Sequence, residues 1–157
     1  MRIARTLTAL AFAFTVALLC LPAAATLAAE EPQQGGRPLA ATLSGDAEVP
    51  GPGDPDGSGT FSLTVNPGQE EICFVLTVAD VDTPTAAHIH SGAPDESGPP
   101  VVTLEAPADG SSDGCMPVER DLATALVRDP GDYYVNVHNE DFPDGAVRGQ
   151  LVRELGK

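Results

Sequence analysis

The chain has 157 residues, of which 23 are acidic and eight are lysine or arginine, so its formal net charge at pH 7 is −15. Such a charge repels the phosphate backbone of nucleic acids and the surface of anionic membranes, which argues against both as partners. The length is enough for one ordinary domain with a single hydrophobic core and too short for two of typical size.

Residues 1–29 have the three-part pattern of a cleavable secretory signal peptide. Two arginines precede an apolar run over residues 9–21, and small residues follow that run. A permanent membrane anchor needs about 20 apolar residues, more than this run supplies. We therefore expect cleavage after Ala25, Ala28 or Ala29, a secreted or periplasmic location, and no membrane association of the mature chain.

A short polar leader and one domain follow the expected signal peptide. Residues 30–38 contain Pro and Gly and lack an apolar period, so we expect a flexible leader there. The folded domain is expected over residues 39–153. All 23 acidic residues lie after residue 29, which favours attraction of cations to the mature chain.

Short segments of alternating or β-branched residues, separated by Gly, Pro and Asp clusters, predict an all-β domain. In residues 61–65, Phe, Leu and Val alternate with Ser and Thr, as in a strand with one buried face. Short strands separated by turn residues in this way are typical of an antiparallel sandwich or barrel. The expected strands span residues 39–49, 57–65, 71–79, 85–91, 101–105, 114–118, 132–139 and 146–152.

One segment departs from the strand pattern. Leu122, Leu126 and Val127 follow a helical spacing, and a Pro-Gly pair ends the run at residue 130. We therefore expect a single short helix over residues 119–129.

Two cysteines remain after removal of the signal peptide, Cys73 and Cys115. In an oxidising compartment an even pair is most simply a disulfide. Closing a loop between residues 42 positions apart would stabilise the fold by roughly 4 kcal/mol. The alternative, that both are metal thiolates, lacks the CxxC spacing of such sites.

The three histidines of the chain are expected on one exposed face of a sheet. His88 and His90 are two residues apart on an expected strand, so both rings project to the same side. In residues 133–138 apolar side chains form one face, and His138 falls on the opposite one. The same alternation turns further polar side chains outward, and the expected polar patch consists of His88, His90, Asn136, His138, Arg148 and Gln150.

Two imidazoles one strand step apart, together with a third from another strand, form a ligand pattern found in copper and zinc sites. His88, His90 and His138 are therefore candidate metal ligands, with Cu or Zn as the candidate ion. A structural role is the alternative. In that role His88 and His90 bond loop carbonyls and hold residues 91–100 over the sheet.

Two observations bear on the chemistry of the patch. Arg148 disfavours a bound cation unless it pairs with an acidic side chain such as Glu140 or Asp141. The sequence shows no nucleophile elbow, phosphate-binding loop or Cys/His protease pair, so no enzymatic activity is expected.

Four separated phrases of this sequence resemble the CHRD domain family, which is named for the repeats of chordin. They are LSGDAEVP at residues 43–50, AAHIHSG at 86–92, YYVNVH at 133–138 and FPDGAVRGQL at 142–151. The resemblance extends over nearly the whole expected domain. It implies an all-β, antiparallel Greek-key sandwich that is immunoglobulin-like or Cu/Zn superoxide dismutase-like, and a secreted setting.

The resemblance implies little about activity. The cysteine-rich modules that bind growth factors in chordin are absent from this sequence, so antagonism of such factors is not carried over. A binuclear superoxide dismutase site needs six histidines and an aspartate, and this chain has three histidines. A mononuclear copper or zinc site remains open.

Three functions are consistent with the sequence. The leading hypothesis is a secreted or periplasmic binding module that recognises an unidentified protein or ligand through the polar patch. The second is a mononuclear metalloprotein that uses His88, His90 and His138. The third is a structural adhesion domain without a small ligand.

Overall fold

The computed structural model describes residues 35–154. The expected signal peptide at 1–29 and most of the expected leader lie outside the described residues. Within the described part, nine strands form one antiparallel sheet that is accompanied by one α-helix and two 3-10 helices. No helix in residues 35–154 is long and apolar enough to cross a bilayer.

The strands and the helix lie close to the positions expected from the sequence pattern. The strands are β1 (Arg37–Ser44), β2 (Ser58–Asn66), β3 (Glu71–Ala79), β4 (Ala86–Ser91), β5 (Pro100–Leu104), β6 (Ser111–Pro117), β7 (Tyr133–His138), β8 (Val147–Gln150) and β9 (Val152–Arg153). The helix α1 spans Arg120–Arg128, and the 3-10 helices span Gly45–Ala47 and Pro130–Asp132.

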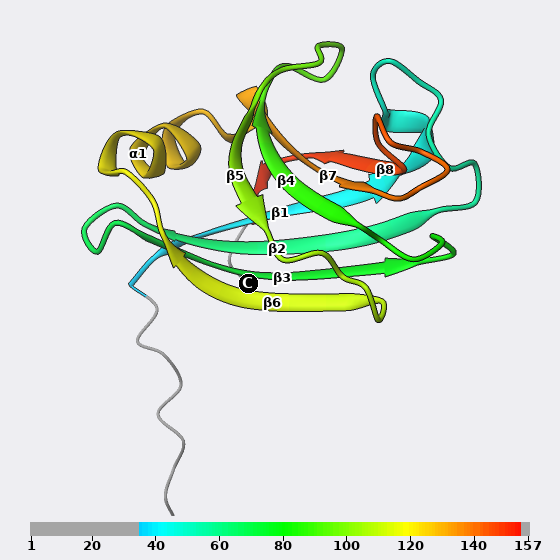
Figure 1. Ribbon diagram of the computed structural model, residues 1–157. Helices are drawn as coiled ribbons and strands as arrows, with labels where there is room; N and C mark the ends of the chain where they lie inside the picture. The colour runs from blue at the N-terminus through cyan, green and yellow to red at the C-terminus, as the bar shows by residue number, and fades with distance from the viewer. Residues whose placement is uncertain (1–34, 155–157) are drawn as a thin grey trace, which may run out of the picture. The chain divides into compact units, whose positions relative to one another are not determined.

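The strand order is β5-β4-β7-β8-β1-β2-β3-β6, and β9 pairs with β1. Because β6 lies beside β3 and β7 beside β4, the chain crosses over between strands that are not neighbours in sequence, as in a Greek key. The sheet curls, so that the half containing β4, β5 and β7 faces the half containing β2, β3 and β6 (Figure 1). The prediction of an all-β antiparallel fold is confirmed, with two halves of one continuous sheet as the layers.

Alternating apolar residues supply the core between the two halves. Phe61, Leu63 and Val65 on β2 are buried, while the serine and threonines between them turn outward. On the facing half, Ile89, Val135 and other apolar residues of β4 and β7 are fully buried. Burial of each such side chain contributes about 1.5–3 kcal/mol to folding, and the core thereby fixes which face of each strand points outward.

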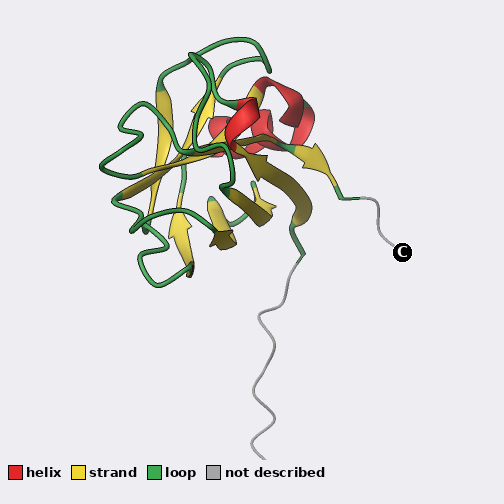
Figure 2. Cartoon of the chain, turned by 90° about the vertical axis from the view of Figure 1, so that its right-hand side faces the viewer, coloured by secondary structure: helices red, strands yellow, loops and turns green. Residues whose placement is uncertain are grey.

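Helix α1 lies beside the strands rather than within the sheet (Figure 2). Its Ala123 and Leu126 are buried in the core, and Leu122 and Val127 are half-buried. Asp129 and Pro130 end the helix, as the sequence predicts, because proline cannot continue the helical hydrogen bonds.

The first and last expected strands are shorter than predicted. β1 stops at Ser44, where the 3-10 helix Gly45–Ala47 begins. A side chain at Gly45 would overlap the backbone of Asp54, so two segments pass each other closely there and the strand ends. At the other end of the chain, Leu151 bonds to the Tyr133 carbonyl and separates β8 from β9.

The expected disulfide between Cys73 and Cys115 is present, which excludes the alternative of two metal thiolates. The two residues are direct cross-strand partners in the pairing of β3 with β6, and their Cα atoms are 4.0 Å apart. The bond therefore attaches β6, a terminal strand of the sheet, covalently to its neighbour.

Replacing both Cys73 and Cys115 with serine should lower the free energy of unfolding by about 2–5 kcal/mol, because the unfolded chain gains freedom. Urea denaturation followed by circular dichroism measures the change. Reductant should destabilise the unmodified protein to a similar extent and leave the serine variant unaffected. Equal denaturation midpoints for the two proteins would show that the disulfide contributes nothing.

Candidate metal centre

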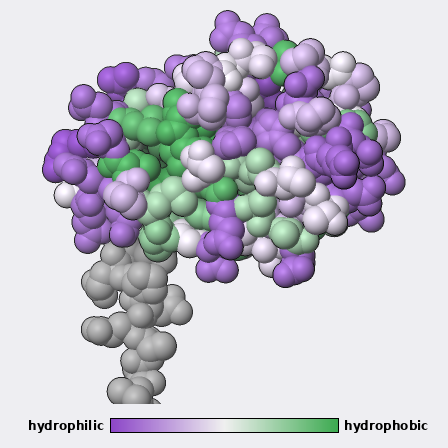
Figure 3. Space-filling model, viewed as in Figure 1, coloured by the Kyte–Doolittle hydropathy of each residue, from purple (hydrophilic) through white to green (hydrophobic). Residues whose placement is uncertain are grey.

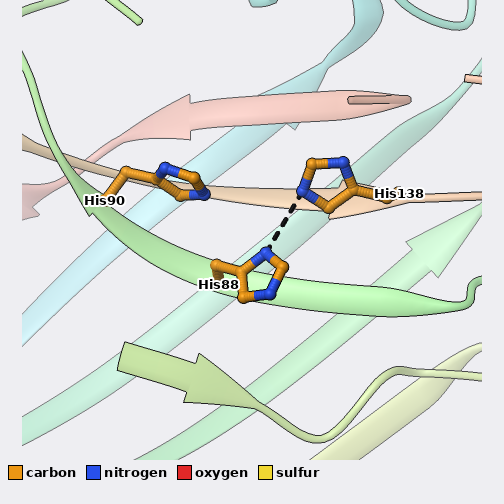
Figure 4. Close-up of side chains that lie close together, drawn as sticks. All are labelled: His88, His90 and His138. Carbon is orange, nitrogen blue, oxygen red and sulfur yellow. Dashed lines mark hydrogen bonds between the residues drawn. The ribbon is translucent and has the colours of Figure 1, made fainter. Parts of the chain in front are cut away.

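The pairing of β4 with β7 brings the three histidines together on the outer face of the sheet. His88 and His90 lie on β4, and His138 is the last residue of β7. In the register of these strands His88 is opposite Asn136, and His138 is opposite Ala86, one strand step from His88. Figure 4 shows the three rings turned toward a common space between the two strands.

The ring nitrogens are close enough to hold one ion. One nitrogen from each histidine lies within 4.8 Å of the other two. His88 Nδ1 and His138 Nε2 are 3.2 Å apart and share a hydrogen bond. Two nitrogens bound to one tetrahedral zinc ion at 2.0–2.1 Å are themselves about 3.3 Å apart, so this pair already has the required spacing.

Backbone carbonyls fix the tautomers of two of the rings. His90 Nδ1 lies 2.8 Å from the Gly98 carbonyl oxygen, and His138 Nδ1 lies 3.0 Å from that of Pro143. A carbonyl oxygen only accepts hydrogen bonds, so both Nδ1 atoms carry the proton and both Nε2 atoms are acceptors. His138 Nε2 accepts the hydrogen bond from His88 Nδ1 at 3.2 Å, which places the proton of His88 on Nδ1. Ligand histidines in metal sites are held in the same way by their second nitrogen.

The free Nε2 of His90 is buried and has no hydrogen-bond partner among the described residues. The ring itself is only 8% exposed to solvent. A buried acceptor without a partner costs roughly 1–3 kcal/mol, and most such groups in proteins are satisfied. A metal ion in the space between the rings would satisfy this atom.

Burial keeps two of the imidazoles neutral. It lowers the pKa of His88, and the nearby His138 and His90 lower that pKa further. The pKa of His138 is also lowered, mainly by burial, although its bond to the Pro143 carbonyl acts in the opposite direction. Metal ions bind neutral imidazole, so these rings are in the binding form at neutral pH.

Asn136 is buried beside the histidines. Its Oδ1 lies 3.1 Å from His138 Nε2, the nitrogen that keeps its electron pair. Two acceptors at that distance repel each other unless the amide is turned to present its Nδ2, or a cation lies against both. Asn136 therefore either donates to His138 or places an oxygen next to a bound ion.

The expectation that the whole polar patch is exposed is wrong for His90, Asn136 and Arg148, which are only 8%, 2% and 1% exposed. The physical reason is that residues 92–99 fold over this face of the sheet. Arg148 donates to the carbonyls of Ala93 and Glu96, both at 2.9 Å. Gln150 donates to the carbonyl of Gly92 at 2.7 Å. These side chains fasten the covering loop.

The structural role considered for the histidines applies to one of them. His90 bonds the loop carbonyl of Gly98, as that interpretation requires. His88 forms no such bond within the described residues and instead contacts His138. The fastening of the loop by Arg148 and Gln150 was not predicted, because strand alternation says only which face a side chain is on.

The Arg148 guanidinium lies 3.4 Å above the centre of the Tyr134 ring, which also stacks on His90 with 4.8 Å between the ring centres. The expected acidic partners of Arg148 were Glu140 and Asp141. Both are exposed, and neither pairs with Arg148 in residues 35–154. The carboxylates that act electrostatically on Arg148 belong to Glu48 and Asp95 instead.

Sequence analysis assigned no role to Glu48, although this residue lies in one of the phrases that resemble the CHRD family. The side chain is 5% exposed. Burial raises its pKa to about 7, against the lowering effects of the Arg148 charge and of a hydrogen bond from the Val49 backbone. Its carboxyl packs against Gly145, where φ is +144° and a side chain would overlap it. Within the expected strand at residues 39–49 no pattern distinguished Glu48 from Asp46, which is exposed.

The described residues thus define an all-β domain with an imidazole cluster beneath a fastened loop. The family model of the CHRD domain matches residues 39–151, which is most of the chain. The chain belongs to the CHRD domain family. No curated protein and no solved structure matches it.

Glu48→Gln should change how stability depends on pH. The folded-state pKa of about 7 lies above the ordinary value of 4.5, so the stabilisation from protonated Glu48 is complete below pH 4.5 and is lost as pH rises through 7. Between pH 5 and pH 8 the unmodified protein should lose up to about 3 kcal/mol relative to Glu48→Gln. Urea unfolding at several pH values measures both curves. If the free energy of unfolding changed with pH in the same way for both proteins, the raised pKa of Glu48 would be contradicted.

Proposed function

We propose that this domain binds one transition-metal ion, Zn²⁺ or Cu²⁺, through His88, His90 and His138. The observation that carries the proposal is the convergence of three imidazole nitrogens within 4.8 Å of one another. The proposal assigns the metal ion as the ligand of a binding domain and assigns no reaction to it.

The donor set favours a particular class of metal. Neutral imidazoles suit zinc, copper, nickel and iron, whereas calcium and magnesium prefer carboxylate and carbonyl oxygens. Affinity for nitrogen ligands generally increases toward copper. With three protein ligands, one coordination position is left for water or another small ligand.

The proposed ligand atoms are His88 Nδ1, His90 Nε2 and His138 Nε2. The Gly98 and Pro143 carbonyls support the assignment for His90 and His138, because each accepts from the other ring nitrogen. For His88 the proposed ligand is Nδ1, because this nitrogen faces His138 Nε2 at a distance of 3.2 Å. Binding of the ion through His88 Nδ1 replaces its hydrogen bond to His138 and leaves the proton of His88 on Nε2.

We further propose that the domain works outside the cytoplasm. The Cys73–Cys115 disulfide supports this location, because such bonds persist in oxidising compartments. The net charge of −15 raises the local concentration of cations around the protein. Both features suit a protein that takes up a metal ion from a dilute surrounding solution.

Equilibrium dialysis of untagged protein against Zn²⁺ and Cu²⁺ should give uptake of one ion per chain. His88→Gln and His138→Gln should each weaken binding by about 100-fold or more. Loss of a residue that only orients a metal ligand already lowers metal affinity by about 10–100-fold, and loss of the ligand itself should cost at least as much. Thr60→Ala, a change at an exposed position on β2, is the matched control and should bind like the unmodified protein. Absence of stoichiometric uptake, or uptake unchanged in both histidine variants, would refute the proposal.

Bound metal should alter the acid sensitivity of the fold. Since the folded-state pKa values of His88 and His138 are lowered from 6.5, the metal-free protein should keep full stability above pH 6.5 and lose it as pH falls through the lowered values. Zn²⁺ at about 1,000 times its Kd should add about 4 kcal/mol near neutral pH, and the gain should disappear in acid. Urea unfolding with and without Zn²⁺ tests this. An identical gain in a His88→Gln, His138→Gln double variant would contradict it.

A further inference from the structure

We propose that the free edge of β5 and the groove beside it form a docking site for an extended segment of another protein. This segment adds a strand to the sheet, and it has basic residues next to its apolar ones. The site is separate from the histidine cluster and is independent of metal binding.

In the part of the chain that the structure describes, no further strand pairs with either end of the sheet. β5 and β6 are the first and last strands of the order, and each pairs with a neighbour on one side only. The other side of such a strand carries backbone N–H and C=O groups without sheet partners. These groups are a template for an added strand, and proteins usually protect them with charges, prolines or bulges.

The two edges differ in how well they are protected. β6 contains Asp113 and Gly114 and ends in Pro117, all of which discourage further pairing. β5 has a proline at its first residue and a register irregularity at Val101, and it continues with Val102, Thr103 and Leu104 in regular pairing with β4. Uncharged, β-branched residues of this kind favour strand pairing. The receptive edge is therefore that of β5.

A groove of about 500 Å³, lined by both apolar and polar side chains, lies next to this edge. Apolar surface is visible over this region, between β5 and α1 (Figure 3). Alternate side chains of an added strand would point into such a groove, which is how strand-addition sites obtain specificity. The apolar lining consists mainly of Val101, Val102, Met116, Val118 and Leu122.

Charge selects the kind of partner. Glu119 lies in the groove wall, and Asp121 is exposed on the first turn of α1. Arg120 is the basic residue of this region, and it is already paired with Glu70 at 2.8 Å. The rim is therefore acidic overall and complements basic residues. A second copy of this chain is disfavoured, because each copy carries a net charge of −15.

The test uses a fluorescent peptide of alternating valine and threonine with two lysines at each end, titrated with the full protein in a fluorescence anisotropy assay. We expect saturable binding and, on binding, slower hydrogen exchange of the backbone amides in residues 101–104. Val101→Asp should weaken binding by about tenfold or more, because a charge would enter the apolar lining of the groove. Val75→Asp, at a position on β3 that is 52% exposed, is the matched control and should bind within about twofold of the unmodified protein.

Both variants add one negative charge, so general attraction of a basic peptide would strengthen equally in the two. A weaker interaction in Val101→Asp alone therefore identifies the edge of β5. The proposal fails if no saturable binding occurs, if both variants bind alike, or if a peptide with methylated backbone nitrogens binds as well as the original. It also fails if the protected amides lie outside β5.

Discussion

The antiparallel pairing of β4 with β7 is the contact on which the candidate site depends. Its register places Ile89 opposite Val135 and turns both into the core, where each is fully buried. His88, His90 and His138 must then project from the other face. A shift of one residue would exchange the two faces, burying imidazoles and exposing isoleucine. The hydrophobic core thus holds the histidine geometry in place from the opposite side of the sheet.

The covering loop completes the arrangement. Arg148 is almost fully buried, which is costly for a charged side chain unless its hydrogen bonds are replaced. Two loop carbonyls, the Tyr134 ring and the carboxylates of Glu48 and Asp95 offset part of its lost hydration, while Nη1 has no hydrogen-bond partner among the described residues. The same loop provides the Gly98 carbonyl that fixes the tautomer of His90. Arg148 therefore holds in place the loop whose Gly98 carbonyl orients His90, a candidate ligand.

Strand alternation and turn residues in the sequence were sufficient to predict eight of the nine strands, the short helix and the disulfide, since these depend on local periodicity or on counting cysteines. The early end of β1 was not predictable, because the close approach of Gly45 to Asp54 depends on tertiary structure. The burial of Arg148 escaped prediction for the same reason, because alternation does not reveal what covers a face. The free edge of β5 is known only once the strand order is known.

X-ray absorption spectroscopy of the zinc- or copper-loaded protein tests the central claim most directly, because it reports the atoms bound to the ion. The account predicts three imidazole nitrogens at about 2.0–2.1 Å from zinc, with one imidazole contribution lost in His88→Gln. A coordination sphere of oxygen atoms alone, or a spectrum unchanged by that substitution, would contradict it.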